Sequence, residues 1–323
     1  MGAANSLFSC IADDLKEVDA LLKKEFTACP VPRVTEVGLH VIGSGGKRMR
    51  PAVTLLMARA IGYQGSDHVL AASAIELLHT ASLMHDDVID LGTERRGKPT
   101  ANALWGNTLA VLIGDFMYTR SFEMLARTKK LEILEPLTHA ANMLSMGEVL
   151  QLDNIADFHV DEARYFAVIE RKTSILFKAA AQMVCAMAAE PPEVETALEN
   201  YCRALGNAFQ ITDDIIDYVS DASVSGKKPG ADYAEGKVTL PVIYAYARSD
   251  KAVREKLQQA FTRHNIPFED VAAIIRESGA IEACQARAAK EIENGEKALA
   301  GLLPSIFKTT LVKLISYVLG RKS

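Results

Sequence analysis

Apolar residues recur at three- and four-residue spacing along most of the chain, a pattern typical of α-helices that bury one face. The strict alternation of apolar and polar residues expected of β-strands is scarce. The longest stretches with helical spacing are residues 70–83, 165–189 and 198–218. Because glycine and proline cluster between such stretches, the pattern predicts loops at residues 43–46, 92–99 and 225–236.

Prolines indicate where several further helices begin, since proline fits the first turn of a helix. These are Pro136, Pro191, Pro192, Pro267 and Pro304. No segment has the composition of a flexible linker. We therefore expect an all-α protein of about a dozen helices, folded as a single domain over residues 1–323.

The composition is that of a globular protein, with 49% hydrophobic and 24% charged residues. Lys and Arg number 36 against 41 Asp and Glu, which gives a net charge of -5. Domains that bind nucleic acid usually carry an excess of positive charge. Nucleic acid is therefore not an expected partner.

The cysteines and the apolar stretches indicate where in the cell the protein is located. The cysteines lie at positions 10, 29, 185, 202 and 284 and form no CxxC pair, which argues against a zinc knuckle or a disulfide framework. No segment reaches the roughly 18 uninterrupted apolar residues that a membrane-spanning helix needs. We therefore expect a cytoplasmic protein without an integral membrane segment.

Two similar acidic motifs follow apolar helical stretches. The first contains Asp86, Asp87 and Asp90 in the segment HDDVID, and the second contains Asp213, Asp214 and Asp217 in the segment TDDIID. On a helix, the first and last aspartate of each motif stack one turn apart and repel each other. The C-terminal end of the helix adds partial negative charge at the same place. One motif alone could be a solvated helix end, but two predict binding of divalent cations.

Magnesium is the cation that best fits this pattern. It binds one or two carboxylates per ion and completes its octahedral shell with water and phosphate oxygens. If the two motifs face each other across a helical bundle, they would form a clamp for a diphosphate group bridged by Mg²⁺ ions.

Basic residues accompany the acidic motifs. The candidates are Lys47, Arg48 and Arg50 beside a glycine-rich turn, Arg95 and Arg96 shortly after the first acidic motif, and Lys172, Lys227 and Lys237. Arginine suits phosphate because its guanidinium presents a planar fork of donors. In a chain with net negative charge, such clustering predicts a polyanionic substrate.

Signatures of several other enzyme classes are absent, namely GxxxxGK[ST], GxSxG and HExxH. Metal-assisted loss of a diphosphate group needs no covalent nucleophile, because the ions neutralise the leaving group and an apolar cavity holds the carbocation. The residues therefore favour an enzyme that ionises an organic diphosphate.

At these residues the sequence resembles the trans-prenyltransferase (polyprenyl diphosphate synthase) family, and within it the long-chain octaprenyl diphosphate synthases. The matching segments are GGKRMRP at 45–51, LLHTASLMHDDVIDLGTERRGKPT at 77–100, GDFMYTR at 114–120, GEVLQL at 147–152, RKTSILF at 171–177, FQITDDIIDY at 209–218 and EGKVTLP at 235–241. The resemblance implies an isoprenoid synthase fold, a single large helical bundle around a central cavity, and a homodimer. It also implies repeated condensation of isopentenyl diphosphate onto an allylic diphosphate, with the released diphosphate as the base.

The resemblance implies residue roles as well. The six aspartates would bind two or three Mg²⁺ ions, and they would be the catalytic residues together with Lys172. Isopentenyl diphosphate would be bound by Lys47, Arg50, His79 and Arg96, and the allylic diphosphate by Arg95, Lys172, Thr173, Gln210, Lys227 and Lys237. Judged by its spacing alone, His79 would be a core histidine of an apolar helix. The loop after the second acidic motif leaves open whether Lys227 or Lys228 points at phosphate.

Small residues precede the first acidic motif. Ser82 lies one helical turn before Asp86, and Ala81 lies beside it. Relatives that stop early often carry a bulky residue at such positions, so a growing tail could pass here toward the N-terminus of the helix. Close packing of a neighbouring helix would also require small residues. We expect a long product, with octaprenyl diphosphate for quinone side chains as the best match.

Three alternatives remain. A short-chain synthase of the same family would make geranylgeranyl or farnesyl diphosphate. A terpene cyclase or squalene-type synthase shares acidic motifs but would not need the GGKRMRP segment for a second diphosphate. A non-catalytic subunit of a heteromeric synthase would be expected to lose aspartates, and this chain keeps all six.

Overall fold

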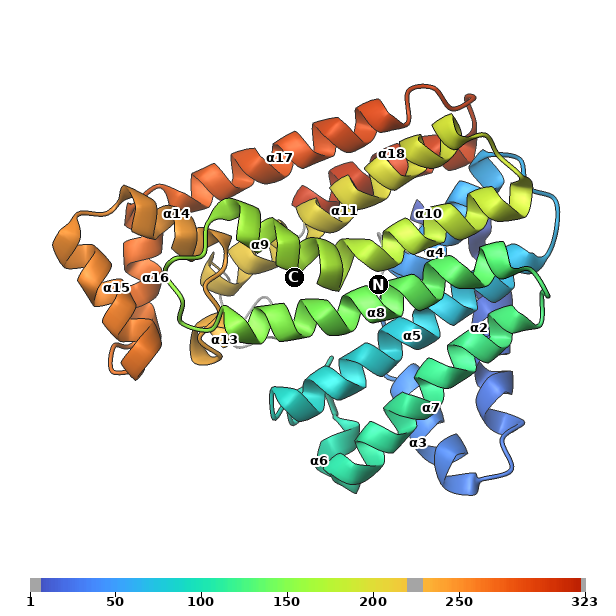
Figure 1. Cartoon of the computed structure of the whole chain (residues 1–323), viewed down its shortest axis with the longest axis horizontal. Helices are drawn as coiled ribbons and strands as arrows, with labels where there is room; N and C mark the ends of the chain where they lie inside the picture. The colour runs from blue at the N-terminus through green and yellow to red at the C-terminus, as the bar shows by residue number, and fades with distance from the viewer. Residues whose placement is uncertain (1–6, 220–228, 321–323) are drawn as a thin grey trace. The chain divides into compact units, whose positions relative to one another are not determined.

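The computed structural model describes residues 7–219 and 229–320 (Figure 1). Within these residues, all regular secondary structure is helical apart from one two-stranded hairpin and one isolated bridge. The all-α prediction is therefore confirmed. The chain divides into two compact units, the first made of Met1–Ala141, Leu176–Glu199 and Gly301–Lys313, the second of Asn142–Ile175, Asn200–Ala300 and Leu314–Ser323.

The first unit contains the N-terminal helices and the hairpin. Its elements are η1 (Ser9–Ile11), α2 (Ala12–Thr27), α3 (Pro32–Ile42), α4 (Met49–Ala60), α5 (Asp67–Ile89), β1 (Glu94–Arg95), β2 (Lys98–Pro99), α6 (Ala101–Trp105) and α7 (Asn107–Ala126). The second unit contains α9 (Glu162–Ile169), η2 (Glu170–Ser174), α13 (Ala231–Ala234), α14 (Leu240–Arg248), α15 (Lys251–Arg263), α16 (Phe268–Glu277) and α17 (Ala280–Ala298). Four helices have residues in both units, namely α8 (Leu131–Asp153), α10 (Ile175–Ala188), α11 (Pro192–Val219) and α18 (Ile306–Leu319).

Helix α5 is the centre of the first unit. It packs against α7, α4 and α2, and Ala71, Ala74, Ile75 and Leu78 have no exposed surface. A helix that is apolar on nearly all sides is buried on all sides, and its alanines allow neighbouring helices to approach closely. The helix ends at the first acidic motif, which it therefore holds on a rigid support.

In the second unit, α14, α15 and α16 lie beside one another and α17 packs on α14 and α16 (Figure 1). Aromatic rings fill the space between them. The ring of Tyr233 packs edge-on against Phe261, with centroids 5.1 Å apart, and its hydroxyl donates to the carbonyl oxygens of Ala260 and Ile266. These contacts fix the segment that follows the second acidic motif.

Most element predictions are confirmed, with three corrections. Residues 70–83 and 198–218 lie inside α5 and α11, and Pro192, Pro267 and Pro304 precede or begin helices. Residues 165–189 do not form one regular helix, because the π-helical turn η2 separates α9 from α10. Pro136 lies inside α8 and does not begin it.

The third correction concerns the predicted loop at 92–99. It forms an antiparallel hairpin in which Glu94 pairs with Pro99 and Arg95 with Lys98. Strands of two residues carry no apolar alternation that a sequence pattern could reveal. Of the predicted loop at 225–236, residues 225–228 lie outside the described residues, and residues 231–234 form the short helix α13.

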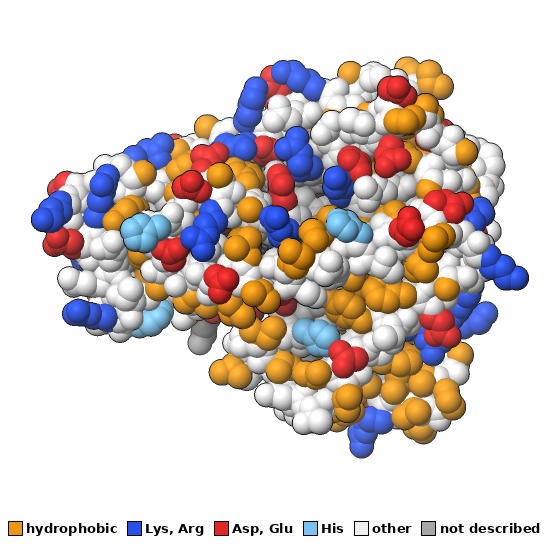
Figure 2. Space-filling view, in the orientation of Figure 1, with side chains coloured by type: hydrophobic (Ala, Val, Ile, Leu, Met, Phe, Trp, Pro, Cys, Tyr) orange, Lys and Arg blue, Asp and Glu red, His pale blue; other side chains and the backbone are white. Residues whose placement is uncertain are grey.

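No helix among the described residues is long and apolar enough to cross a membrane. None of the five cysteines forms a disulfide. On the face drawn in Figure 2, acidic and basic side chains are interspersed with hydrophobic ones.

His68, in the first turn of α5, is 3% exposed, and neither of its ring nitrogens has a hydrogen-bond partner. Burial lowers the pKa of His68 from the usual 6.5, and the charge of Arg59 adds to this effect. The unfolded chain thus binds a proton more readily than the folded chain does. The free energy of unfolding should therefore fall as the pH drops below about 6.5.

We expect His68→Leu to keep the wild-type melting temperature at pH 7.5 or to raise it, because it removes two unsatisfied buried nitrogens. Between pH 7.5 and pH 5.5 its melting temperature should fall less than that of the wild type, as measured by circular dichroism. His139→Gln, at an exposed position of α8, should keep the wild-type slope. Equal slopes for His68→Leu and the wild type would contradict the prediction.

Candidate functional site: two pockets lined by charged residues

A pocket in the first unit lies between the C-terminal half of α5, the hairpin and the turn that follows α3. The charged residues and histidines that line it are His40, Arg48, Glu76, His79, Asp87, Arg95 and Arg96. Three residues predicted to bind one or the other diphosphate, His79, Arg95 and Arg96, therefore share one pocket with an aspartate of the first acidic motif.

His79 lies among the positively charged side chains of this pocket. Desolvation holds the pKa of His79 well below its usual value, and Arg50, Arg96, Arg95 and Arg48 lower it further. The ring is therefore neutral. Its Nε2 accepts a hydrogen bond of 2.9 Å from Nη1 of Arg50. Arg50, also predicted to bind isopentenyl diphosphate, is thus held at the pocket through His79.

The turn before α4 is shaped to meet the hairpin. Arg96 donates to the carbonyl oxygen of Gly45, and Gly46 has a φ of +151°. A Cβ at Gly46 would lie 2.5 Å from Nη1 of Arg96. Any other residue at position 46 would therefore displace Arg96, which explains why the segment needs glycine here. Lys47, the next residue, is exposed.

The first acidic motif closes the other side of the pocket. The carboxylate of Asp87 is 8% exposed and accepts from Nε of Arg95 at 2.8 Å. Its backbone oxygen accepts from Gly92, which begins the loop. Asp86 lies in the last turn of α5 and Asp90 follows as its C-cap, as the sequence predicted for the end of a helix. The sequence assigned Arg95 to the allylic diphosphate, and in this structure Asp87 holds it.

A second pocket, of about 160 Å³, lies in the second unit. The predicted residues that line it are Lys172, Thr173, Gln210, Asp214 and Lys237, and the residues that the sequence did not single out are Gln151, Asn154, Val160, Tyr165, Val168, Ile169, Asp232, Val238 and Thr239. Residues from α8, η2, α11 and the loop after α13 therefore converge, among them four of the six residues predicted to bind the allylic diphosphate.

The π-helical turn η2 places Lys172 in this pocket. Its Nζ lies 2.7 Å from Glu148 Oε2 and 2.6 Å from Gln151 Oε1, both on α8. A Cβ at Gly147 would lie 2.9 Å from the Cβ of Arg171. Gly147 thus lets η2 approach α8, which accounts for the GEVLQL segment. Single π turns inside helices are frequently found at functional sites.

Asp214 is the buried member of the second acidic motif. It is 3% exposed, its Oδ2 accepts from the hydroxyl of Tyr165 at 2.6 Å, and its Oδ1 accepts from Nε2 of Gln210 at 2.8 Å. Burial raises the pKa values of both Asp214 and Asp232. The charges of Asp213 and Asp217 raise the pKa of Asp214 further, and the charges of Asp214 and Asp217 raise that of Asp232. The charged forms of two such buried carboxylates are stabilised by a nearby cation.

The other aspartates of this motif lie in different surroundings. Asp217 accepts hydrogen bonds from the backbone amides of Gly230, Ala231 and Asp232, at 3.0–3.2 Å, and so anchors the start of α13. Asp213 is partly buried and does not line the pocket. Lys227 and Lys228 lie outside the described residues.

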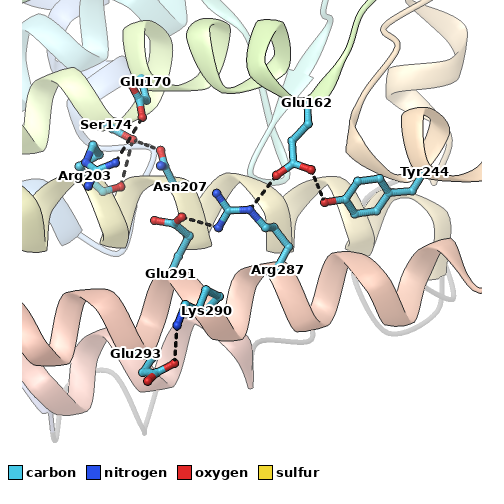
Figure 3. A network of polar contacts seen from close by, with 10 residues as sticks. All are labelled: Glu162, Glu170, Ser174, Arg203, Asn207, Tyr244, Arg287, Lys290, Glu291 and Glu293. Carbon is cyan, nitrogen blue, oxygen red and sulfur yellow. Dashed lines mark hydrogen bonds and ion pairs between the residues drawn. The ribbon is translucent and has the colours of Figure 1, made fainter. Parts of the chain in front are cut away.

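Polar contacts around η2 and α17 support this pocket (Figure 3). Ser174 Oγ donates to Asn207 Oδ1 at 2.8 Å, which ties η2 to α11. Arg287 of α17 and Tyr244 of α14 both donate to Glu162 of α9, at 2.9 and 2.8 Å. The network therefore fixes the two ends of the α9–η2 segment that carries Tyr165 and Lys172.

Among the described residues, no three His, Cys, Asp or Glu side chains form a group that could hold a metal ion. An Mg²⁺ ion would therefore take much of its shell from water and a diphosphate, as Mg²⁺ commonly does. Asp87 and Asp214 supply carboxylate oxygens in the two pockets. These oxygen donors fit a hard cation that is bound together with its substrate.

Sequence reasoning missed Glu76, Tyr165 and Asp232. Glu76 and Tyr165 lie within apolar helical stretches, where they carried no recognisable signal. In the sequence, Asp232 stands out only as a member of the loop that follows the second acidic motif. Arg48 was noted as one of three basic residues beside the glycine-rich turn, but no role followed from its position.

Comparison with known proteins identifies the family of the chain. A polyprenyl synthetase family model matches residues 31–278. The chain is 40% identical to octaprenyl diphosphate synthase of Escherichia coli over 314 residues, which cover 96% of each chain.

Solved structures give the same result. The crystal structure of a decaprenyl diphosphate synthase from Rhodobacter capsulatus has a TM-score of 0.94 at 37% identity and covers 99% of both chains. A polyprenyl synthase from Caulobacter crescentus, complexed with calcium and isoprenyl diphosphate, also has a TM-score of 0.94, at 34% identity, and covers 100% of this chain and 99% of that one. The chain therefore belongs to the polyprenyl synthetase family of prenyltransferases and has its all-α isoprenoid synthase fold.

Proposed function

We propose that this chain condenses isopentenyl diphosphate repeatedly onto an allylic diphosphate until it has built an octaprenyl chain for a quinone. At the coarser level it is a long-chain all-trans-polyprenyl diphosphate synthase, like its octaprenyl, nonaprenyl and decaprenyl relatives at 37–40% identity. The observation that carries the condensation with isopentenyl diphosphate is the first pocket, where Arg95, Arg96 and His79 meet the aspartate Asp87. A diphosphate acceptor needs this cationic set beside the ionising centre. The octaprenyl length is supported by the 40% identity to octaprenyl diphosphate synthase of Escherichia coli.

We assign the first pocket to isopentenyl diphosphate, with Lys47, Arg50, His79 and Arg96 as its ligands. The second pocket would hold the allylic diphosphate through Lys172, Thr173, Gln210 and Lys237, and Lys227 and Arg95 belong to the same assignment. Arginine and lysine both form charge-assisted hydrogen bonds with phosphate. The support is that His79 and Arg96 line the first pocket and Arg50 contacts His79, whereas Lys172, Thr173, Gln210 and Lys237 line the second. Arg95 lines the first pocket, beside Asp87.

Asp86, Asp87 and Asp90 would hold Mg²⁺ in the first unit, and Asp213, Asp214 and Asp217 would hold Mg²⁺ in the second, two or three ions in all. A divalent ion is supported by the Caulobacter crescentus relative, whose structure holds calcium and isoprenyl diphosphate. When bound, the ions would neutralise the charge that develops on the departing diphosphate.

The residues of the chain then have defined tasks in each condensation. Lys172, held by Glu148 and Gln151, would grip the leaving diphosphate as the allylic C–O bond breaks and its electron pair departs. The double bond of isopentenyl diphosphate, positioned by Arg96 and Lys47, forms the new C–C bond. The released diphosphate takes the proton that restores a double bond, because no side chain in the first pocket is an evident base.

The wider organisation is also part of the proposal. Four helices have residues in both compact units, which supports one synthase domain over residues 1–323. A homodimer is supported by apolar side chains left exposed on α7, such as Val111 and Leu112, and on α8, such as Met146 and Val149. A cytoplasmic location is supported by cysteines that form no disulfide.

Removal of divalent ions with a chelator should abolish turnover, and Mg²⁺ should restore it. Asp86→Ala and Asp213→Ala should each lower kcat by about a hundredfold or more, because transition-state charge is no longer neutralised. Circular dichroism should show unchanged helical content, and Asp153→Ala, at an exposed position, should keep normal turnover. Full activity after chelation would refute the metal assignment, and unfolding of either variant would make that aspartate structural.

Arg96→Ala and Lys47→Ala should raise the KM for isopentenyl diphosphate more than the KM for the allylic substrate. Loss of a charge-assisted phosphate contact costs about 1.5–3 kcal/mol, or on the order of ten- to a hundredfold in KM. Initial rates measured with each substrate varied in turn give both constants. An equal increase in both would show that the two pockets are assigned wrongly.

Product size tests the long-chain assignment. Incubation with Mg²⁺, isopentenyl diphosphate and an allylic primer should give octaprenyl diphosphate, whereas a short-chain synthase would stop at three or four units and a non-catalytic subunit would give no product.

Ala81, fully buried on α5, should control the length to which the tail of the product can grow. Ala81→Phe places a ring across its path, and products should shorten to roughly four units, given the helix rise. Full-length product from Ala81→Phe at the normal rate would exclude this route.

A further inference from the structure

Arg48 lies in the GGKRMRP segment between two residues assigned to isopentenyl diphosphate, yet its guanidinium is used within the protein. Nε donates to Asp19 of α2 at 3.1 Å, Nη1 to Glu76 of α5 at 2.8 Å, and Nη2 to the carbonyl oxygen of Ile42 at 3.0 Å. Ile42 is the last residue of α3 and Arg48 is the N-cap of α4. One side chain therefore joins four helices of the first unit.

The backbone conformation at Arg48 also indicates that this residue is held in a fixed position. Its φ of +46° is in the left-handed region, which a residue with a Cβ adopts only where the surroundings enforce it. The side chain of Glu76 is 6% exposed and that of Arg48 is 20% exposed. Because both charges are largely removed from water and paired, the contact is geometrically strict.

The contact also sets the register of α4 on α5. Glu76 and His79 are three residues apart on α5 and so share a face. Arg48 is bound to the first and Arg50 to the second. The turn that precedes Arg48 supplies the Gly45 carbonyl oxygen that holds Arg96. A displacement of Arg48 would therefore move Lys47, Arg50 and Arg96 together.

We propose that Arg48 is a positioning residue for isopentenyl diphosphate: through Glu76, Asp19 and Ile42 it holds the glycine-rich turn so that its neighbours bind the diphosphate. The alternative is that Arg48 binds the diphosphate itself. The proposal rests on the assignment of the first pocket to isopentenyl diphosphate.

Glu76→Gln separates the two roles by the sign of its effect. If Arg48 positions the turn, loss of the Glu76 charge loosens the turn, and the KM for isopentenyl diphosphate should rise several-fold. If Arg48 binds the diphosphate, Glu76→Gln frees Arg48 and removes a negative charge from the pocket, and the KM should fall. A fall in KM, or no change, overturns the proposal.

Arg48→Met should raise the KM for isopentenyl diphosphate about tenfold, with the KM of the allylic substrate and kcat within about threefold of the wild type. Arg48→Lys, which cannot reach three acceptors, should give an intermediate value. In the double variant Arg48→Met with Glu76→Gln, the increase in the KM for isopentenyl diphosphate should not exceed that of Arg48→Met alone, because both substitutions break the same Arg48–Glu76 contact. Fully additive effects overturn the proposal.

Arg59→Met is the matched control. Arg59 lies on the same helix, about 16 Å along it, and pairs with Asp14 of α2 at 2.7 Å with a similarly small exposed fraction. It should lower the melting temperature as Arg48→Met does but leave both KM values unchanged. Equal KM increases in the two variants would show that Arg48 acts only through stability.

The variants Arg96→Ala and Lys47→Ala distinguish the possible failures. If they leave the KM for isopentenyl diphosphate unchanged, the pocket assignment is wrong. If they raise it and Arg48→Met does not, the pocket assignment holds and the positioning role of Arg48 is refuted.

Discussion

Mutual repulsion among like charges is the constraint on which both pockets depend, because each pocket brings several charged side chains of one sign close together. In the first unit, Arg48, Arg50, Arg95 and Arg96 all act on His79. The protein reduces their repulsion in two ways. Glu76 and Asp87 pair with Arg48 and Arg95, and the histidine at the centre stays neutral.

The second unit meets the same constraint with the signs reversed. Asp214 and Asp232 both line the second pocket, burial raises the pKa of each, and the charge of Asp214 raises the pKa of Asp232 further. Hydrogen bonds from Tyr165 and Gln210 hold Asp214 in one orientation, and Lys237 offsets the charge of Asp232. In both pockets, charges of one sign are thus paired with or offset by a charge of the other sign.

Rigid elements hold these charges in place. The first acidic motif lies at the end of α5, whose other turns are buried among α2, α4 and α7. Because this packing prevents the helix from bending, repulsion cannot move the carboxylates apart. Lys172 is held by a π turn that fits against α8 only because residue 147 is glycine. Binding groups on such supports need little reorganisation when the substrate arrives.

The sequence by itself determined the helical class, the central parts of α5 and α11 and the position of the acidic motifs at helix ends. These features depend on spacings of three or four residues, which are local. Resemblance to a family supplied the residue sets. His79 and Arg96 of one set share a pocket, and Lys172 and Gln210 of the other share a pocket with Asp214, but Arg95 of the second set lies in the pocket of the first. Only the tertiary structure decided which charges pair: Arg48 with Glu76, Arg95 with Asp87, and Tyr165 with Asp214. The hairpin, the π turn and the anchoring of α13 by Asp217 were equally invisible, because each depends on contacts or backbone geometry that side-chain periodicity does not encode.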